Sequence, residues 1–123
     1  MSPVQRKLAS PVLSFDLVAE KRIVQTELDA GHSRIARTIV KEGPLRVTLI
    51  GVRAGGEMHE HETDGPITIQ VLEGAVTVRA GNETRRLAAG ALMAIDGGVR
   101  HDVSSAEGGL FLLTLIAPDT HRP

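Results

Sequence analysis

The chain has 123 residues and a formal net charge of −1, from 14 basic and 15 acidic side chains. This length fits one domain with a single core. The near balance of charge excludes the basic footprint of a nucleic-acid-binding protein. With two Phe and no Tyr or Trp, the chain also lacks an aromatic surface on which bases or sugars could stack. We therefore expect no nucleic-acid partner and no lectin-type sugar site.

Residue types also limit the covalent chemistry and the location. The chain has no cysteine, which excludes disulfides, thiolate metal sites and a thiol nucleophile. Its apolar runs are far shorter than the ~20 residues that span a bilayer. The segment after Arg6 and Lys7 is broken by polar residues and by Pro11, so it is a poor secretory signal. These features predict a soluble, cytoplasmic protein without a membrane partner.

The first 33 residues are predicted to form an N-terminal arm. Residues 1–13 contain two prolines and show little periodicity. A short helix is expected near residues 15–22, with Ser14 as its N-cap, and Gly31 is expected to break the helical pattern. Residues 34–118 are assigned to one β domain, and residues 119–123 to a C-terminal tail.

From residue 35 the sequence changes to short apolar runs separated by glycine, which is typical of all-β proteins. The candidate strands are Ile35–Val40, Leu45–Arg53, Glu57–His61, Ile67–Leu72, Ala75–Ala80, Glu83–Leu87, Ala91–Ile95, His101–Ser105 and Leu110–Ile116. The segments between them carry turn residues, and one turn is predicted at Glu73-Gly74. Eight or nine short strands at this spacing indicate a sandwich or a jelly-roll barrel.

The last candidate strand, Leu110–Ile116, is almost entirely apolar. A strand that is apolar on both faces is covered on both faces. In so small a domain a second subunit can supply the second cover. The sequence therefore predicts a homodimer.

Three of the five histidines lie in two short segments that a small β-barrel would bring together at its mouth. His59 and His61 are two residues apart in a candidate strand, so alternation predicts both rings on one face, roughly 7 Å apart. His101 follows a glycine-rich turn and can reach the same place from a neighbouring strand. Imidazole is the commonest neutral ligand of transition metals. We predict that His59, His61 and His101 bind one divalent metal ion (Zn, Fe, Ni or Mn) with an open coordination position.

The spacing of these residues resembles the small single-domain cupins of the RmlC-like superfamily. The first cupin motif is written G-x5-H-x-H-x3,4-E-x6-G. The pair His59-x-His61 fits it, and Gly74 fits its closing glycine. The second motif is written G-x5-P-x-G-x2-H-x3-N. Here Gly90, Gly98 and His101 keep that spacing, while Asp96 replaces the proline and Ser105 the asparagine.

The resemblance covers about residues 43–117. It implies an all-β, double-stranded β-helix (jelly-roll) barrel at residues 34–118, with metal ligands facing the barrel interior. The interior is expected to be lined by Ile67, Ile69, Val71, Leu92 or their neighbours, and so to be apolar and sized for a small organic molecule.

The motif's glutamate is missing, because its position falls at Ile67. The loop that carries Glu62 and Asp64 is one residue longer than the motif allows, and either carboxylate could approach the site. Glu57 shares the strand parity of His59 but lies roughly 13 Å along the strand from His61. Gln70 offers only an amide oxygen. Neutral ligands alone would bind metal more weakly than a set with a carboxylate.

Three functional readings remain open from the sequence. In the first, the metal acts as a Lewis acid or binds O2 beside a small organic substrate, as in a dioxygenase or an isomerase. In the second, the barrel is a non-catalytic ligand-binding, sensor or dimerisation module without metal. In the third, His61 or His101 is the general base of a metal-free isomerase, with Asp102 as its acidic partner. A catalytic triad with Ser104 or Ser105 is disfavoured, because no nucleophile elbow is present. The substrate and the catalytic residues are not specified.

Overall fold

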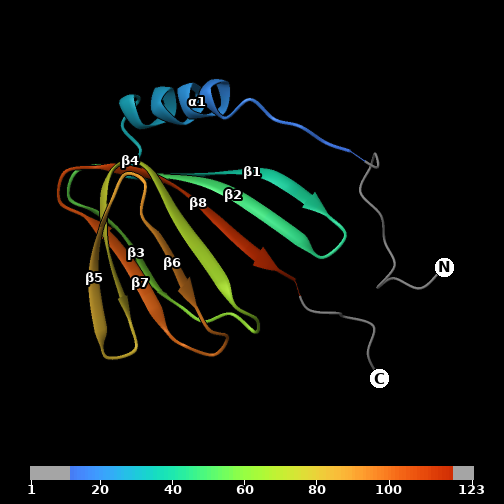
Figure 1. Cartoon of the computed structure of the whole chain (residues 1–123). Helices are drawn as coiled ribbons and strands as arrows, with labels where there is room; N and C mark the ends of the chain where they lie inside the picture. Colours follow the sequence, from blue (N-terminus) through green and yellow to red (C-terminus); the bar gives the residue numbers. More distant parts are fainter. Residues whose placement is uncertain (1–11, 118–123) are drawn as a thin grey trace.

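The computed structural model describes residues 12–117, with the backbone alone at Glu60 and His61. Within these residues one helix precedes eight strands: α1 (Leu17–Asp29), β1 (Arg34–Glu42), β2 (Leu45–Val52), β3 (Gly56–His61), β4 (Ile67–Ala80), β5 (Glu83–Ala88), β6 (Leu92–Ile95), β7 (His101–Ser105) and β8 (Gly109–Ile116). The strands pair in the order β1-β2-β8-β4-β7-β3, and β5 and β6 also pair with β4. Every strand pair is antiparallel, and the sheet curls into a jelly roll (Figure 1). The predicted all-β barrel is confirmed.

Helix α1 is longer than predicted and starts later. Asp16, and not Ser14, is its N-cap, because the Oδ1 atom of Asp16 accepts hydrogen bonds from the backbone N–H groups of Val18 (3.0 Å) and Ala19 (3.3 Å). The helix continues to Asp29 because the side chains of its second half pack against the sheet. Gly31, with φ 115°, follows the helix end as predicted.

Strand β4 replaces two predicted strands, so the predicted turn at Glu73-Gly74 is wrong. Residues 67–74 pair with β8 and β6, and residues 75–80 pair with β5 and β7. A register shift between Val71 and Glu73 makes a bulge, and Gly74 has φ 68°. A bulge bends a strand without ending it. Strand β4 therefore belongs both to sheet A (β1, β2, β8, β6 and residues 67–74) and to sheet B (β3, β7, β5 and residues 75–80).

The barrel interior is filled with aliphatic side chains and one Phe. Ile67, Ile69 and Val71 are each 1% exposed, as expected for the interior. Leu92 is 65% exposed, so its predicted place in the lining is wrong. Strand alternation turns its neighbours inward instead. The buried interior cluster, called the barrel core below, consists of Ile50, Val52, Ile67, Ile69, Val71, Val76, Val78, Leu87, Ile95, Val103 and Phe111.

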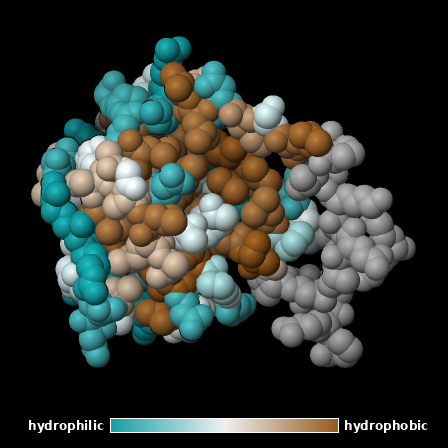
Figure 2. Space-filling view, in the orientation of Figure 1, coloured by the Kyte–Doolittle hydropathy of each residue, from teal (hydrophilic) through white to brown (hydrophobic). Residues whose placement is uncertain are grey.

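Helix α1 lies on the outer face of sheet A. Its buried residues Val24 and Leu28 pack with Leu49 and Leu110 of the sheet. The contact is so close that a Cβ atom on Gly51 would lie 2.6 Å from Cγ1 of Val24. In the view of Figure 2, hydrophilic residues occupy the side where β5 lies, and apolar residues gather over the middle strands. The barrel therefore has two chemically different sides.

Some predictions fall outside what the structure describes. The assigned tail at residues 119–123 and most of the predicted loose arm at residues 1–13 lie beyond residues 12–117. In the described part of the chain, no helix is long and apolar enough to cross a membrane. The cytoplasmic location stays a prediction.

Replacing Gly74 with Ala is expected to destabilise the barrel. A Cβ atom there would lie 2.1 Å from the carbonyl oxygen of Gly108. A side chain at positive φ costs about 1–2 kcal/mol, and overpacking adds about 1–3 kcal/mol. We expect the free energy of unfolding, measured by urea titration, to fall by about 2–5 kcal/mol.

The control for this prediction is Gly81→Ala. Gly81 also has positive φ, at 59°, but the nearest atom to its added Cβ would be Cγ1 of Val99, at 3.8 Å. Only the backbone cost of about 1–2 kcal/mol should appear. Equal losses in the two variants would contradict the close approach at Gly74.

Candidate functional site

Two of the predicted ligands occupy paired backbone positions at one end of sheet B. Strands β3 and β7 are antiparallel, and Gly56 pairs with Ser105 at one end of the ladder while His61 pairs with His101 at the other. On its other side, His101 is paired with Ala80 of β4. Cα atoms of directly opposed residues lie about 4.5–5.5 Å apart. The sheet thus brings positions 61 and 101 together from distant parts of the sequence.

A register shift in β3 changes how the faces of His59 and His61 relate to each other. Met58 pairs with Val103 and His61 with His101, so three steps along β3 correspond to two along β7. Strict alternation, from which both rings were expected on one face, does not hold through this bulge. Met58 packs against the barrel core, whereas the His59 side chain is 85% exposed, with its Nδ1 atom 4.0 Å from Oε1 of Glu57. The direction of the His61 side chain is not described, so the three-His site stays a prediction.

His101 has the burial and the orientation expected of a functional imidazole. The residue is 6% exposed, and its Nδ1 atom lies 3.2 Å from the carbonyl oxygen of Val99. A carbonyl oxygen can only accept, so this hydrogen bond requires the proton on Nδ1. The lone pair is then on Nε2, the atom that would bind a metal or take up a proton. An acceptor behind the ring fixes ligating histidines in this way.

Gly97 and Gly98, in the turn before β7, contact the loop that follows β3. The N–H of Gly98 donates to the carbonyl oxygen of Thr63 (2.8 Å). A Cβ atom on Gly97 would lie 2.3 Å from the carbonyl oxygen of Asp64. The loop after β3 therefore packs directly on the turn before β7. This contact explains physically why the second motif has a glycine-rich turn before His101.

No carboxylate joins His101 in the part of the structure with described side chains. Ile67, at the motif's glutamate position, lies in the barrel core. Glu62, Asp64 and Gln70 are exposed. Among described side chains, no three of the types His, Cys, Asp and Glu gather where they could hold a metal ion. The described side chains therefore do not make a metal site by themselves, and the predicted site requires His61.

Asp102 is not the acidic partner that a metal-free base would need. Its Oδ2 atom accepts from Nη2 of Arg79 at 2.7 Å, and these two residues are paired across β7 and β4. His101 and Val103 are buried on the inner side of β7, so Asp102 between them faces outward. The expectation that Asp102 supports His101 is wrong, because neighbours along a strand point to opposite faces.

Ser105 has a structural role that the sequence did not reveal. Its buried hydroxyl donates to the carbonyl oxygen of Ala75 (2.6 Å) and accepts from the N–H of Gly108 (2.8 Å). It therefore ties the turn between β7 and β8 to the bend of β4. The motif places an asparagine at this position, which is also a hydrogen-bonding residue. The position of Ser105 in the motif, four residues after His101, was the only feature of the sequence that pointed to this residue.

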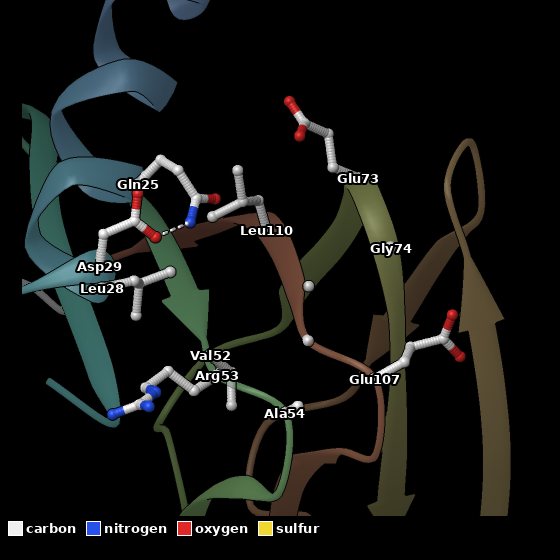
Figure 3. Close-up of a pocket in the computed structure, with 12 residues that line it drawn as sticks. Gln25, Leu28, Asp29, Val52, Arg53, Ala54, Glu73, Gly74, Glu107 and Leu110 are labelled. Atoms are coloured by element: carbon white, nitrogen blue, oxygen red, sulfur yellow. Dashed lines mark hydrogen bonds between the residues drawn. The ribbon is translucent and has the colours of Figure 1, made fainter. Parts of the chain in front are cut away.

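Two surface hollows in the described residues lie away from His101. One, of about 580 Å³, runs over the outer face of sheet B beside His59. The other, of about 530 Å³, lies between α1 and the turn before β8, where Leu28 and Leu110 are among its apolar lining residues (Figure 3). Its polar lining groups are engaged within the protein: Gln25 with Asp29, Glu73 with Lys21, Glu107 with Arg86, and Arg53 with the Gly31 carbonyl. Neither hollow is the predicted histidine site.

Comparison with known families gives one match over most of the barrel. The family model described as "Cupin domain" matches residues 45–115. This range includes all the motif residues named above. Among curated proteins, none matches the chain.

Solved structures share the fold at low sequence identity. The TT1209 protein from Thermus thermophilus is 24% identical, with a TM-score of 0.71, over 87% of this chain and 100% of that one. A conserved Streptococcus pyogenes protein of unknown function (SPY1581) is 25% identical, with a TM-score of 0.66, over 71% of this chain and 76% of that one. Salicylate 1,2-dioxygenase from Pseudoaminobacter salicylatoxidans is 24% identical, with a TM-score of 0.75, over 90% of this chain but 35% of the dioxygenase chain. These likenesses establish the architecture.

Replacing Ser105 with Ala is expected to lower the free energy of unfolding by about 1–3 kcal/mol, because a buried carbonyl and a partly buried N–H lose a partner. Ser104→Ala is the matched control. Ser104 is half-buried and lines the hollow on the outer face of sheet B. Its replacement should change stability by less than about 0.5 kcal/mol. Thermal or urea unfolding compares the two, and equal effects would refute the bridging role of Ser105.

Proposed function

This chain belongs to the cupin family, and on that basis we propose that it binds a divalent transition metal (Zn, Fe, Ni or Mn) and a small organic molecule at one end of the barrel. His61 and His101 are the central ligands in this proposal, and His59 is the third. The single observation that carries it is the pairing of positions 61 and 101, with His101 buried and oriented by the Val99 carbonyl.

The described contacts of the His59 side chain are weak. Its ring is 85% exposed, and its described ionic contact is the 4.0 Å approach to Glu57. Exposed contacts of this kind contribute about 0–1 kcal/mol. His59 also lies within the bulged segment of β3, and bulges often re-aim side chains next to functional sites. A change in the bulge would be needed to bring the ring to the inner side.

The surroundings of His101 support an organic ligand with an apolar part. Met58, Ala80 and Val99 are partly buried, and all three pack against the barrel core. Their apolar surface would exclude water from a ligand beside His101, while Nε2 would accept a proton or a metal bond. A bound divalent metal would supply Lewis acidity. Dioxygenation is one reaction to screen, because a salicylate 1,2-dioxygenase shares the fold.

A second candidate function is a non-catalytic ligand-binding, sensor or dimerisation module. One observation favours it: Ile67, at the position of the motif's glutamate, is 1% exposed within the barrel core. A cupin that keeps its barrel without that carboxylate can still bind a metabolite through the apolar residues near His101. We place the protein in the cytoplasm under either proposal.

Metal content distinguishes the two functions. Protein purified without chelator and reconstituted with each of the four metals is expected to hold about one ion per chain, by elemental mass spectrometry. His61→Ala and His101→Ala should abolish binding, and His59→Ala should weaken it at least ~10-fold, because each replacement removes an imidazole ligand. His32→Ala is the control, since His32 is an exposed histidine outside the motifs. Wild-type protein without metal, or equal loss in His32→Ala, would contradict the metal proposal.

A further inference from the structure

Among the described side chains of β3, Met58 is the one that faces the barrel interior. It is partly buried and packs against the barrel core. The side chain of the next residue, His59, is 85% exposed. Neighbours along a strand point to opposite faces. The donor atom that β3 directs inward at this point is therefore the thioether sulfur of Met58 and not an imidazole nitrogen of His59.

The pairing of β3 with β7 places Met58 next to His101 on the inner face of sheet B. The two strands lie side by side (Figure 1), and Met58 pairs with Val103, which is two residues from His101 along β7. Val103 and His101 are both buried. Met58 and His101 are thus diagonal cross-strand neighbours, whose Cα atoms lie about 7–8 Å apart, within reach of a long side chain. Methionine is long, unbranched and flexible, so its sulfur can approach the imidazole.

The sulfur of Met58 and one nitrogen of His101 are neutral donors in apolar surroundings. Nε2 of His101 carries the lone pair, because Nδ1–H donates to the carbonyl oxygen of Val99 at 3.2 Å. Ala80, which pairs with His101 from β4, and Val99 are partly buried and pack against the barrel core. The carboxylate of Asp102 faces outward and accepts a hydrogen bond from Arg79. This pair of donors therefore favours a metal ion that prefers soft, uncharged ligands.

We propose that Met58 and His101 bind a Cu(I) ion through Sδ and Nε2. Among first-row transition metals, Cu(I) is the ion that thioether sulfur selects, whereas carboxylates and carbonyl groups suit harder ions. A monovalent ion is also easier to place among apolar side chains than a divalent one, because the cost of taking an ion out of water grows with its charge. The chain has no cysteine, so its three methionines are its only sulfur donors.

The Cu(I) site rests on the proposed function only in sharing His101 with it. The divalent ion would need a change in the bulge of β3 to bring His59 inward, whereas Cu(I) uses Met58 in the direction that the structure gives it. The buried Ile67, at the position of the motif's glutamate, also agrees with a soft ion, which does not require a carboxylate. The two proposals therefore differ in one ligand, and replacing Met58 tests only the second.

Competition with the Cu(I) chelator bicinchoninate, in anaerobic buffer with ascorbate as reductant, measures the affinity. The wild type is expected to take a single Cu(I) ion per chain from the chelator. Met58→Leu should raise the dissociation constant for Cu(I) at least ~10-fold, because leucine keeps the side-chain volume and removes the sulfur. Met93→Leu is the matched control and should bind Cu(I) like the wild type. Met93 is also partly buried against the barrel core, but it lies on β6, which pairs with β4 rather than with β3 or β7.

Methyl NMR locates the ion in the wild type, without a substitution in the site. With carbon-13 methyl-labelled methionine, Cu(I) should shift the Met58 signal and leave the Met93 signal in place, and the two leucine variants assign the signals. A wild type that takes no Cu(I) from bicinchoninate would overturn the proposal. So would wild-type affinity in Met58→Leu, equal losses in the two leucine variants, or an unshifted Met58 signal.

The Cu(I) proposal and the divalent-metal proposal can fail separately. The divalent experiment reads the content of zinc, iron, nickel or manganese and the loss in His59→Ala. The Cu(I) experiment reads copper and the loss in Met58→Leu. Absence of a divalent ion therefore leaves the Met58 result to be decided by its own measurement, and absence of Cu(I) leaves the His59 result in the same position.

Discussion

The bend of β4 at Gly74 sets the relative positions of the two halves of the barrel. Before the bend β4 pairs with β8 and β6, and after it with β5 and β7. The backbone of the turn between β7 and β8 occupies the space that a side chain on Gly74 would fill, and the hydroxyl of Ser105 bridges that turn to Ala75. One residue without a side chain and one buried hydroxyl thus fix the corner on which both sheets depend.

This corner also positions the candidate site at the far end of sheet B. Strand β7 runs between them, with Ser105 at the corner and His101 next to Ala80 of β4 and His61 of β3. The placement of His101 follows from the barrel itself. His59 faces away from the core because it follows Met58 along the strand, and the bulge between Met58 and His61 changes how its face relates to that of His61. If His59, His61 and His101 bind a metal as proposed, the affinity would depend on the local geometry of β3.

The outer faces of the two sheets carry different types of residue. In sheet B, charged residues on neighbouring strands form pairs such as Arg79 with Asp102. Sheet A has α1 over one end, and Val47, Thr114, Thr68 and Ala94 form one uncharged row across β2, β8, β4 and β6.

The sequence by itself determined the all-β class, the positions of most strands and the cupin assignment, because glycine punctuation, apolar alternation and motif spacing are local properties. It also identified the interior faces of Ile67, Ile69 and Val71. It failed at Glu73-Gly74, where one continuous strand bends instead of ending in a turn, and it gave no sign of the bulge between Met58 and His61. Only the tertiary structure decided these points, together with the outward position of Leu92 and the partner of Asp102. Register shifts and cross-strand partners are set by contacts between residues far apart in the chain, and single-sequence periodicity does not contain them.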